Sequence, residues 1–394
     1  MKTRVAIYAE APPGWGGSFQ YATSILDAVA ALDRNAYDIR VWCRHPAWPP
    51  LIAAKQLNSV MFGGGLHDLS YRGISRTLAH IGARNAAPNL VRCWEKLQPA
   101  ARDITRWKAD ICINLQQTSL GLPPHVRQIS PIHDLMHLYE TRFPEVAERT
   151  EWLARQWLFG NIALRCTKIL VDSPTGARHV MDKFSVPADQ LVVLPFIAPS
   201  SLLTAQPKRP PSLSTAVKED GFIFYPAQFW QHKNHVGLLE AIASIKHAAI
   251  PCVFTGTTDK NGYQNFTKAV ARLGLESRVY LLGYVDDAEL CWLYRNARLM
   301  AMPTFLGPTN IPPLEAMSLD CPVAISNVYG MREQLRDAAL YFDPNNTADM
   351  ANVLKHLWDS ARLRDALREK GRLRIASWNT QHFEKAVQNI IMSV

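Results

Sequence analysis

The chain has 394 residues, of which 48% are hydrophobic and 20% are charged, which is typical of a soluble globular protein. A single hydrophobic core seldom serves a chain of this length, so we expect two domains. No run of 18 apolar residues and no signal-peptide pattern is present, and the seven cysteines form no C-x-x-C pair. These features favour a reduced, cytoplasmic compartment and exclude a membrane-spanning protein.

The formal net charge is +9, and much of it lies between Lys55 and Lys108, where nine Lys/Arg face three acids. A basic segment of this kind suits anionic lipid, phosphorylated substrates or nucleic acid. No nucleic-acid-binding motif accompanies it, so we expect no nucleic acid partner. The pattern of residues 68–97 is helical, and two interpretations stay open: a packed helix pair, or peripheral docking on an anionic membrane.

Short apolar runs alternate with helix-length amphipathic segments along the whole chain, which predicts βαβ units and an α/β fold with parallel sheets. In the first half we expect strands at 4–8, 39–42, 60–62, 111–114, 128–132, 168–172 and 190–194. The expected helices there are 18–32, with Ser18 as a possible N-cap, then 148–166 and 174–184. His133 and Asp134 follow a predicted strand directly, where open α/β sheets bind ligands, and Gly16-Gly17 follow the first strand.

Residues 198–217 are rich in Pro and Ser, which predicts a stiff linker with little to bury. We therefore expect domains at 1–197 and 218–376, with a final helix segment at 377–394. The second half predicts strands at 222–225, 252–255, 279–282, 299–302 and 323–326. The predicted helices are 234–246, 264–273, 286–296, 313–319, 347–360, 363–375 and 380–392.

The most informative stretch runs from Pro303 to Met317, where a buried strand leads through a Gly/Pro-rich turn into a helix. Proline suits the first helical turn, and Glu315 follows Pro312-Pro313 closely. We expect an anion site there, formed by free backbone N–H groups, with the Glu315 carboxylate facing the hydroxyls of a ribose. The alternative interpretation is a well-capped surface helix without a ligand.

The segment from Tyr225 to His235 resembles the phosphate-binding loop of family 4 retaining glycosyltransferases. Lys233 falls on the family's lysine, and Gln228 falls on its arginine. The stretch around Glu315 resembles the family's E-x7-E motif, with Glu315 on the second glutamate and Gly307 on the first. The sequence Gly-Pro-Thr-Asn-Ile-Pro-Pro-Leu-Glu-Ala resembles a subgroup of bacterial surface-polysaccharide and O-antigen transferases.

The resemblance implies a GT-B architecture: two Rossmann-like domains facing across a cleft, with the last helix crossing back to the first domain. It implies that Thr309, Asn310 and the amides around Ile311 hold sugar hydroxyls, and that Tyr284 lies near the nucleobase. Together, the residues expected to bind the donor are Gly16, Gly17, Gln228, Lys233, Tyr284, Gly307, Thr309, Asn310, Ile311, Pro312, Leu314 and Glu315. Those expected to act in catalysis are His133, Lys233 and Glu315.

The implied reaction is transfer of a hexose, with retention, from a nucleotide diphosphate sugar to a hydroxyl of a glycan, lipid-linked at the inner membrane face. We expect no cofactor and no metal, since Asp286-Asp287 open a helix and Asp286 suits an N-cap. Two alternatives stay open. One is a nucleotide-sugar-binding protein that lost catalysis through Gly307 and Gln228, and the other is a sugar-nucleotide epimerase using His133-Asp134.

Overall fold

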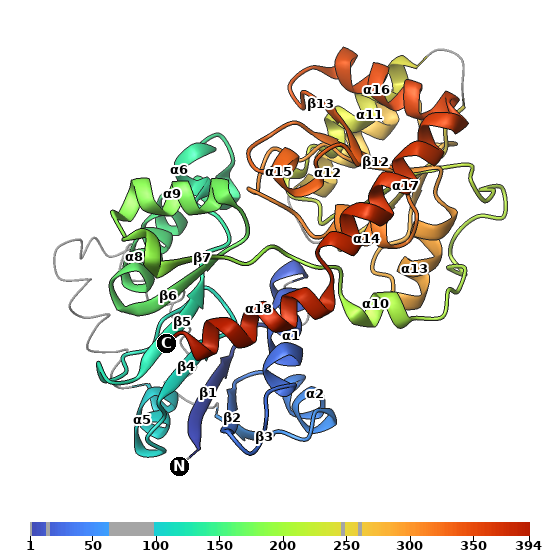
Figure 1. Cartoon of the computed structure of the whole chain (residues 1–394). Helices are drawn as coiled ribbons and strands as arrows, with labels where there is room; N and C mark the ends of the chain where they lie inside the picture. The colour runs from blue at the N-terminus through green and yellow to red at the C-terminus, as the bar shows by residue number, and fades with distance from the viewer. Residues whose placement is uncertain (1, 13–15, 63–97, 246–248, 259–261) are drawn as a thin grey trace. The chain divides into compact units, whose positions relative to one another are not determined.

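The computed structural model describes residues 2–12, 16–62, 98–245, 249–258 and 262–394 (Figure 1). The chain forms two compact units, one of Met1–Pro195 with Thr380–Val394 and one of Phe196–Asn379. The predicted helical segment 68–97, with most of the basic residues, lies outside the described residues. Within the described part, no helix is both long and apolar enough to cross a bilayer.

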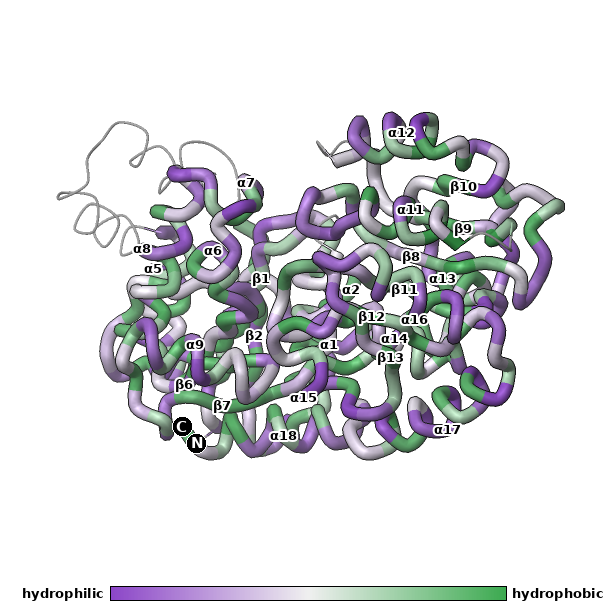
Figure 2. Tube along the Cα trace, turned by 90° about the horizontal axis from the view of Figure 1, so that it is seen from above, coloured by the Kyte–Doolittle hydropathy of each residue, from purple (hydrophilic) through white to green (hydrophobic). Residues whose placement is uncertain are grey.

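The first unit is built on a seven-stranded parallel sheet in the order β3-β2-β1-β4-β5-β6-β7. Its strands are β1 Thr3–Ala9, β2 Tyr37–Cys43, β3 Asn58–Met61, β4 Ile111–Asn114, β5 Arg127–Pro131, β6 Cys166–Val171 and β7 Leu191–Val193. The central strands are buried on both faces, which explains their near-continuous apolar sequences. Figure 2 colours the chain by the hydropathy of each residue. The strand order reverses between β1 and β4, which places a topological switch point there.

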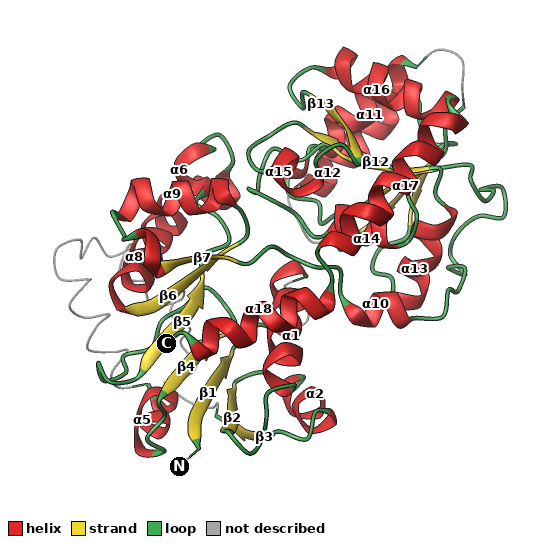
Figure 3. Cartoon of the chain, in the orientation of Figure 1, coloured by secondary structure: helices red, strands yellow, loops and turns green. Residues whose placement is uncertain are grey.

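Helices cover both faces of this sheet (Figure 3). They are α1 Gly17–Ala30, α2 Trp48–Ala54, α5 Pro99–Arg106, α6 Met136–Tyr139, α7 Pro144–Ala147, α8 Arg149–Arg165, α9 Pro174–Phe184, the 3₁₀ turn η3 Ala188–Gln190 and α18 Thr380–Met392. The prediction that Ser18 caps α1 is wrong: the N-cap is Gly16, and Ser18 lies inside the first turn. The helix α2 was not predicted, because its seven residues are too few to show a clear period.

The last helix, α18, belongs to the first unit although the chain enters it from the end of the second. It packs on α1, where the rings of Phe383 and Tyr21 meet edge to face with centroids 6.4 Å apart. Phe383 is completely buried in this contact. The predicted return of the final helix to the amino-terminal part of the chain is confirmed.

The second unit repeats the plan with six parallel strands in the order β10-β9-β8-β11-β12-β13. The strands are β8 Ile223–Pro226, β9 Cys252–Thr255, β10 Val279–Leu281, β11 Leu299–Met302, β12 Val323–Ser326 and β13 Ala339–Phe342. The helices are α10 Ser200–Thr204, η4 Gln231–Lys233, α11 His235–Ser244, α12 Gly262–Arg272, α13 Asp287–Asn296, α14 Pro312–Ser318, α15 Met331–Leu335, α16 Thr347–Asp359 and α17 Ala361–Ser377. The prediction of two doubly wound α/β sheets is confirmed, and β13 and α15 are additions to it.

The stretch 198–217 differs from the expected linker. It contains α10, and Leu202, Leu213 and Val217 are all buried. The expectation that this stretch buries little is therefore wrong. Its Pro/Ser composition indicates irregular backbone correctly, but three apolar side chains suffice to attach irregular backbone to a core.

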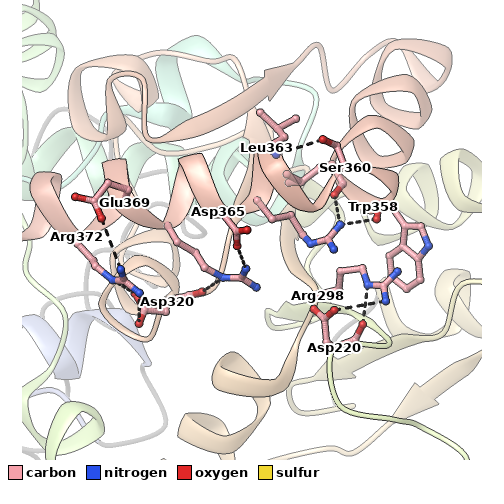
Figure 4. A network of polar contacts seen from close by, with 12 residues as sticks. Asp220, Arg298, Asp320, Trp358, Ser360, Leu363, Asp365, Glu369 and Arg372 are labelled. Atoms are coloured by element: carbon pink, nitrogen blue, oxygen red, sulfur yellow. Dashed lines mark hydrogen bonds and ion pairs between the residues drawn. The ribbon is translucent and has the colours of Figure 1, made fainter.

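In the second unit, arginines on the long helix α17 bind Asp320, which follows α14 (Figure 4). Arg372 donates through Nε to Oδ1 of Asp320 at 2.7 Å, and Arg368 donates through Nε to the Asp320 carbonyl oxygen at 3.1 Å. Gly371 lies against α14: a Cβ there would lie 3.3 Å from Cγ of Met317. The helix α17 therefore packs against α14.

Candidate functional site

The loop between β11 and α14 contains most of the residues expected to bind the donor. Gly307 has φ +100°, a conformation that favours glycine. A Cβ at Gly307 would lie only 2.9 Å from Nδ2 of Asn310 and from the Thr309 carbonyl oxygen. No side chain fits there without displacing Asn310, so a glutamate at position 307 is incompatible with this loop conformation.

Asn310 occupies the space beside Gly307 and reaches a second predicted motif. Its Oδ1 accepts a hydrogen bond from Nζ of Lys233 at 3.4 Å, although the two residues are 77 positions apart. Its Nδ2 donates to the Leu306 carbonyl oxygen at 3.3 Å. The structure therefore brings Lys233, Gly307 and Asn310 together within the second unit.

Lys233 ends the 3₁₀ turn η4, and Asn234 separates it from α11. The backbone of Lys233 is fixed by a buried phenol. The Tyr225 hydroxyl donates to the Lys233 carbonyl oxygen at 2.8 Å. Burial raises the pKa of Tyr225 well above its ordinary value, so the hydroxyl keeps its proton and remains a donor. The ammonium of Lys233 thus starts from a rigid backbone position.

The N-terminus of α14 differs from the expected anion site. Pro312 and Pro313 have no N–H, and the N–H groups of Leu314 and Glu315 both donate to the Ile311 carbonyl oxygen, at 2.9 and 3.2 Å. The Asn310 N–H also has a partner, Oε1 of Gln334 at 3.1 Å. The expectation of free N–H groups here is wrong, because the prolines that favour the first helical turn also remove its donors.

Glu315 is buried, with 3% of its surface exposed, and lies on α14 facing α13. Its Oε2 accepts a hydrogen bond from the Tyr294 hydroxyl at 2.7 Å. Burial, and then the Glu315 carboxylate, raise the pKa of Tyr294 well above its ordinary value, so the phenol stays a donor. The orientation of Glu315 is therefore set by Tyr294, a residue that the sequence motifs did not indicate.

Gln228 follows β8 and contacts the loop after β9. Its Oε1 accepts from the Thr257 hydroxyl at 2.6 Å and from the Thr257 N–H at 3.1 Å. Because the amide oxygen is engaged in this way, the amide nitrogen is the end of Gln228 that can donate to an anion. Tyr284 follows β10, and 82% of its side chain is exposed, so its ring is accessible for stacking.

Ile311 and Thr309 are buried, with 6% exposed each, and Leu314 is buried at 4%. Pro312 opens α14, and the apolar side chains beside it pack into the second unit. A role for Ile311 and Leu314 in holding sugar hydroxyls would therefore depend on their backbone groups alone.

In the first unit, His133 follows β5, as predicted. Its N–H donates to Oε1 of Gln117 at 2.9 Å, and its ring meets the Tyr21 ring edge to face at 4.6 Å. Burial lowers the pKa of His133 to about 4, against an opposing effect of Asp134. The imidazole is therefore neutral near pH 7 and offers one donor and one acceptor.

Asp134 is tied into the fold. Burial raises the pKa of Asp134, but nearby Arg155 and the Met136 N–H outweigh it and leave this pKa below its ordinary value. Oδ1 of Asp134 accepts from Arg155 Nη1 at 3.1 Å and from Met136 N at 3.0 Å. A carboxylate held in this way is a poor proton acceptor, which weakens the epimerase interpretation of His133-Asp134.

Gly16 and Gly17 lie at the start of α1, in the same unit as His133. Gly16 has φ +53°, and its carbonyl oxygen accepts from the N–H groups of Phe19 and Gln20 at 2.9 and 3.0 Å. A Cβ at Gly16 would meet nothing within 4 Å, so the glycine is required by its backbone conformation and faces open space.

Asp286 caps α13 as predicted. Its Oδ1 accepts from the Glu289 N–H at 2.8 Å, while Oε2 of Glu289 accepts from the Asp286 N–H at 3.3 Å. This is a complete capping box. In the described part of the chain, no cluster of three His, Cys, Asp or Glu side chains could hold a metal ion.

Comparison with known proteins gives the context of this site. Residues 213–374 match the family described as glycosyl transferases group 1. The chain is 30% identical over 201 residues to O-antigen chain mannosyltransferase B of Escherichia coli, a match that covers 49% of this chain and 52% of that protein. It is 24% identical over 193 residues to O-antigen chain mannosyltransferase RfbU of Salmonella typhimurium, covering 49% and 51%. These two matches thus span about half the length of each of the two relatives.

In fold, the likeness extends along the whole chain. The crystal structure of HepE from Anabaena in complex with UDP-glucose superposes with a TM-score of 0.73 over 99% of this chain and all of that one, at 13% identity. Identity this low speaks for the fold only, and the predicted GT-B fold is confirmed. The residues that match the glycosyl transferases group 1 family, 213–374, lie within the second unit and include Lys233, Asn310 and Glu315.

Proposed function

We propose that this protein is a retaining glycosyltransferase that moves a hexose from a nucleoside diphosphate sugar to a hydroxyl of a glycan in surface-polysaccharide assembly. The observation that carries the proposal is the approach of Lys233 to Asn310, which joins two motifs expected to hold the donor. The match of residues 213–374 to group 1 glycosyl transferases supports the same activity. Two relatives are O-antigen chain mannosyltransferases, which favours mannose as the sugar.

In this proposal the second unit binds the donor. The Lys233 ammonium and the Gln228 amide nitrogen face the diphosphate, and Tyr284 stacks on the base. Glu315, whose orientation is set by Tyr294, accepts a hydrogen bond from the ribose. As the bond between the sugar and the diphosphate breaks, its electron pair passes to a phosphate oxygen. Preorganised donors stabilise this growing charge, and Lys233 is the strongest of them.

The acceptor hydroxyl attacks on the face that the diphosphate leaves, and its proton passes to the departing phosphate. No carboxylate nucleophile is required, which suits a site whose first motif position is Gly307. The neutral imidazole of His133 positions the sugar or the acceptor through hydrogen bonds. We propose that the reaction needs no metal, because Asp286 caps α13 and the adjacent Asp287 lies in the first turn of that helix.

We further propose a lipid-linked acceptor and peripheral contact with an anionic membrane. This part rests on the basic composition of the sequence between Lys55 and Lys108, most of which lies outside the described residues. Sedimentation with vesicles of neutral or anionic lipid would test it. Equal binding to both kinds of vesicle would contradict it.

The central test is a thermal-shift panel of nucleotide sugars, including GDP-mannose and UDP-glucose, because a ligand of the native state raises stability by about 2.7 kcal/mol at 100 times its Kd. One donor should raise the melting temperature by several degrees. Transfer to an acceptor should then release nucleoside diphosphate, and NMR should show the anomeric configuration of the donor retained, in the presence of EDTA. Stabilisation without any release would instead indicate a binding protein.

A further inference from the structure

The side-chain amide of Gln334 forms hydrogen bonds with both backbone groups of Asn310. Gln334 lies on α15, is 5% exposed, and uses both ends of its side-chain amide on one residue. Its Oε1 accepts from the Asn310 N–H at 3.1 Å, and its Nε2 donates to the Asn310 carbonyl oxygen at 2.7 Å. The amide thus pairs with the Asn310 backbone as a neighbouring β-strand would, and leaves the Asn310 side chain available for other contacts.

The Asn310 side chain uses this freedom to join Lys233 to the loop. Its Oδ1 lies 3.4 Å from the Lys233 Nζ, and its Nδ2 lies 3.3 Å from the Leu306 oxygen. Gly307, which has no Cβ, provides the space for this arrangement. We propose that Gln334 is a positioning residue for donor binding, which acts by holding Asn310 against Lys233.

Gln334 is itself held from two sides. Its N–H donates to the Gly330 carbonyl oxygen at 2.9 Å within α15, and its carbonyl oxygen accepts from Nε of Arg374 on α17 at 2.6 Å. Because both backbone groups of Gln334 are hydrogen-bonded, its side chain projects from a fixed position. The order of support therefore runs from α17 through Gln334 to Asn310 and then to the ammonium.

The chemistry of this contact requires a neutral amide. A carboxylate at position 334 would still accept from the Asn310 N–H, but it would repel the Asn310 carbonyl oxygen and attract Lys233 away from an anionic ligand. A leucine would leave both buried backbone groups of Asn310 without their partner. We therefore expect glutamate and leucine at position 334 both to change the donor KM by more than a loss of folding stability would cause.

This inference rests on the proposed function, so the test begins with donor binding by the wild-type protein. If no nucleotide sugar binds it, the proposed function fails before Gln334 is tested. If one does, the donor KM and kcat are measured for Gln334→Leu, Asn310→Ala and the double variant. Gln334→Leu should raise the donor KM about tenfold and change kcat less, because residues in one network are coupled.

The double variant decides between positioning and mere support. If Gln334 acts through Asn310, Gln334→Leu should change the donor KM by less than about twofold once Asn310 is alanine. The same tenfold effect in both backgrounds would overturn the proposal. So would an unchanged KM in Gln334→Leu.

A matched control lies in the first unit. Gln190 donates through Nε2 to the carbonyl oxygens of Ala163 and Cys166, at 2.8 and 2.7 Å, without contact to any expected donor residue. Gln190→Leu should lower the melting temperature and leave the donor KM unchanged. Should Gln334→Leu fail to fold, Gln334→Glu keeps one of the two bonds and should still raise the KM at least threefold. An unchanged KM in Gln334→Glu would then overturn the proposal.

Discussion

The two units share one feature at equivalent positions: a buried glutamine that binds the loop after the fourth strand. In each sheet the fourth strand in sequence lies beside the first, at the switch point, and a loop follows it: residues 115–120 after β4 and residues 303–311 after β11. A buried glutamine pairs with both backbone groups of one residue in each loop. Gln128 pairs with Leu120 at 3.0 Å for both bonds, and Gln334 pairs with Asn310.

What the two glutamines support differs. In the first unit the paired residue, Leu120, is apolar and buried, and the same loop supplies Gln117 to the N–H of His133. In the second unit the paired residue is polar and reaches the charged Lys233. The loop that is paired with a glutamine therefore binds the backbone of His133 in the first unit and the ammonium of Lys233 in the second. Variants of the two loops should affect different steps.

The largest expected effect is that of Lys233→Ala. This variant tests whether the second unit holds the diphosphate. Lys233→Ala should lower turnover by about 100-fold to 1,000-fold, as removal of one charge-stabilising donor typically does. Initial rates at saturating acceptor would measure it. Lys268→Ala, at an exposed position of α12, is the control and should keep wild-type rates. A Lys233→Ala protein within tenfold of wild type would place the diphosphate elsewhere.

The counterpart in the first unit is His133. We expect His133→Ala to lower kcat at least tenfold and His133→Gln to lower it less, because glutamine can still donate and accept one hydrogen bond each. Since burial keeps the pKa of His133 near 4, the wild-type rate should show no loss from its protonation between pH 8 and pH 6. Turnover of His133→Ala within a few-fold of wild type would remove His133 from the mechanism.

A third prediction compares two glycines with positive φ in the second unit. Gly307→Ala should lower the free energy of unfolding by about 1–3 kcal/mol and raise the donor KM, because its Cβ would collide with Asn310. Gly274 has φ +64° with nothing within 4 Å of a Cβ. Gly274→Ala should cost only about 1 kcal/mol and leave the KM unchanged. Denaturant unfolding and donor kinetics of both variants would show whether the crowding at Gly307 matters.

The strands were predictable because parallel strands covered on both faces are almost continuously apolar, as in β4, β9 and β11. Lys233, Gly307 and Glu315 could be found from motif spacing. Their approach in space follows from the topology, because β8 and β11 are neighbours and the motifs follow these two strands.

The supporting contacts could not be predicted. Gln334 and Tyr294 act across 24 and 21 residues, through side-chain geometry that leaves no local pattern. The loss of N–H donors at Pro312-Pro313 shows the opposite difficulty. The sequence predicted the start of the helix correctly, because proline favours the first helical turn. The predicted anion site was wrong, because proline also lacks the N–H that such a site needs.

Three histidines with lowered pKa values predict how stability depends on pH in the two units. Burial lowers the pKa of His133 and His137 to about 4 in the first unit, and that of His235 to about 3 in the second. Each lies below the ordinary value of 6.5, so the unfolded chain binds more protons between these limits. The stability that depends on these histidines being neutral is therefore fully present above pH 6.5. It falls as the pH drops towards 4, by up to about 1.4 kcal/mol per pH unit for each histidine.

Urea unfolding at several values between pH 7.5 and pH 4.5 would measure this dependence. If the units unfold in separate transitions, the first should lose stability about twice as steeply, because it contains two of the three histidines. His235→Phe should reduce the slope in the second unit only. If the free energy of unfolding depended on pH equally steeply in the two units, the assigned effects of burial on the three histidines would be contradicted.

The smallest expected effect on donor binding is also the direct test of the comparison. Gln128→Leu leaves the N–H and the carbonyl oxygen of Leu120 without their partner and should cost about 1–3 kcal/mol of stability, as Gln334→Leu should. The donor KM should stay within about twofold of wild type, while kcat falls a few-fold because Gln117 no longer holds the backbone of His133 firmly. If Gln128→Leu instead raised the donor KM as much as Gln334→Leu, the two loops would share one role. The contrast between a neutral loop and a charged loop would then have no functional meaning.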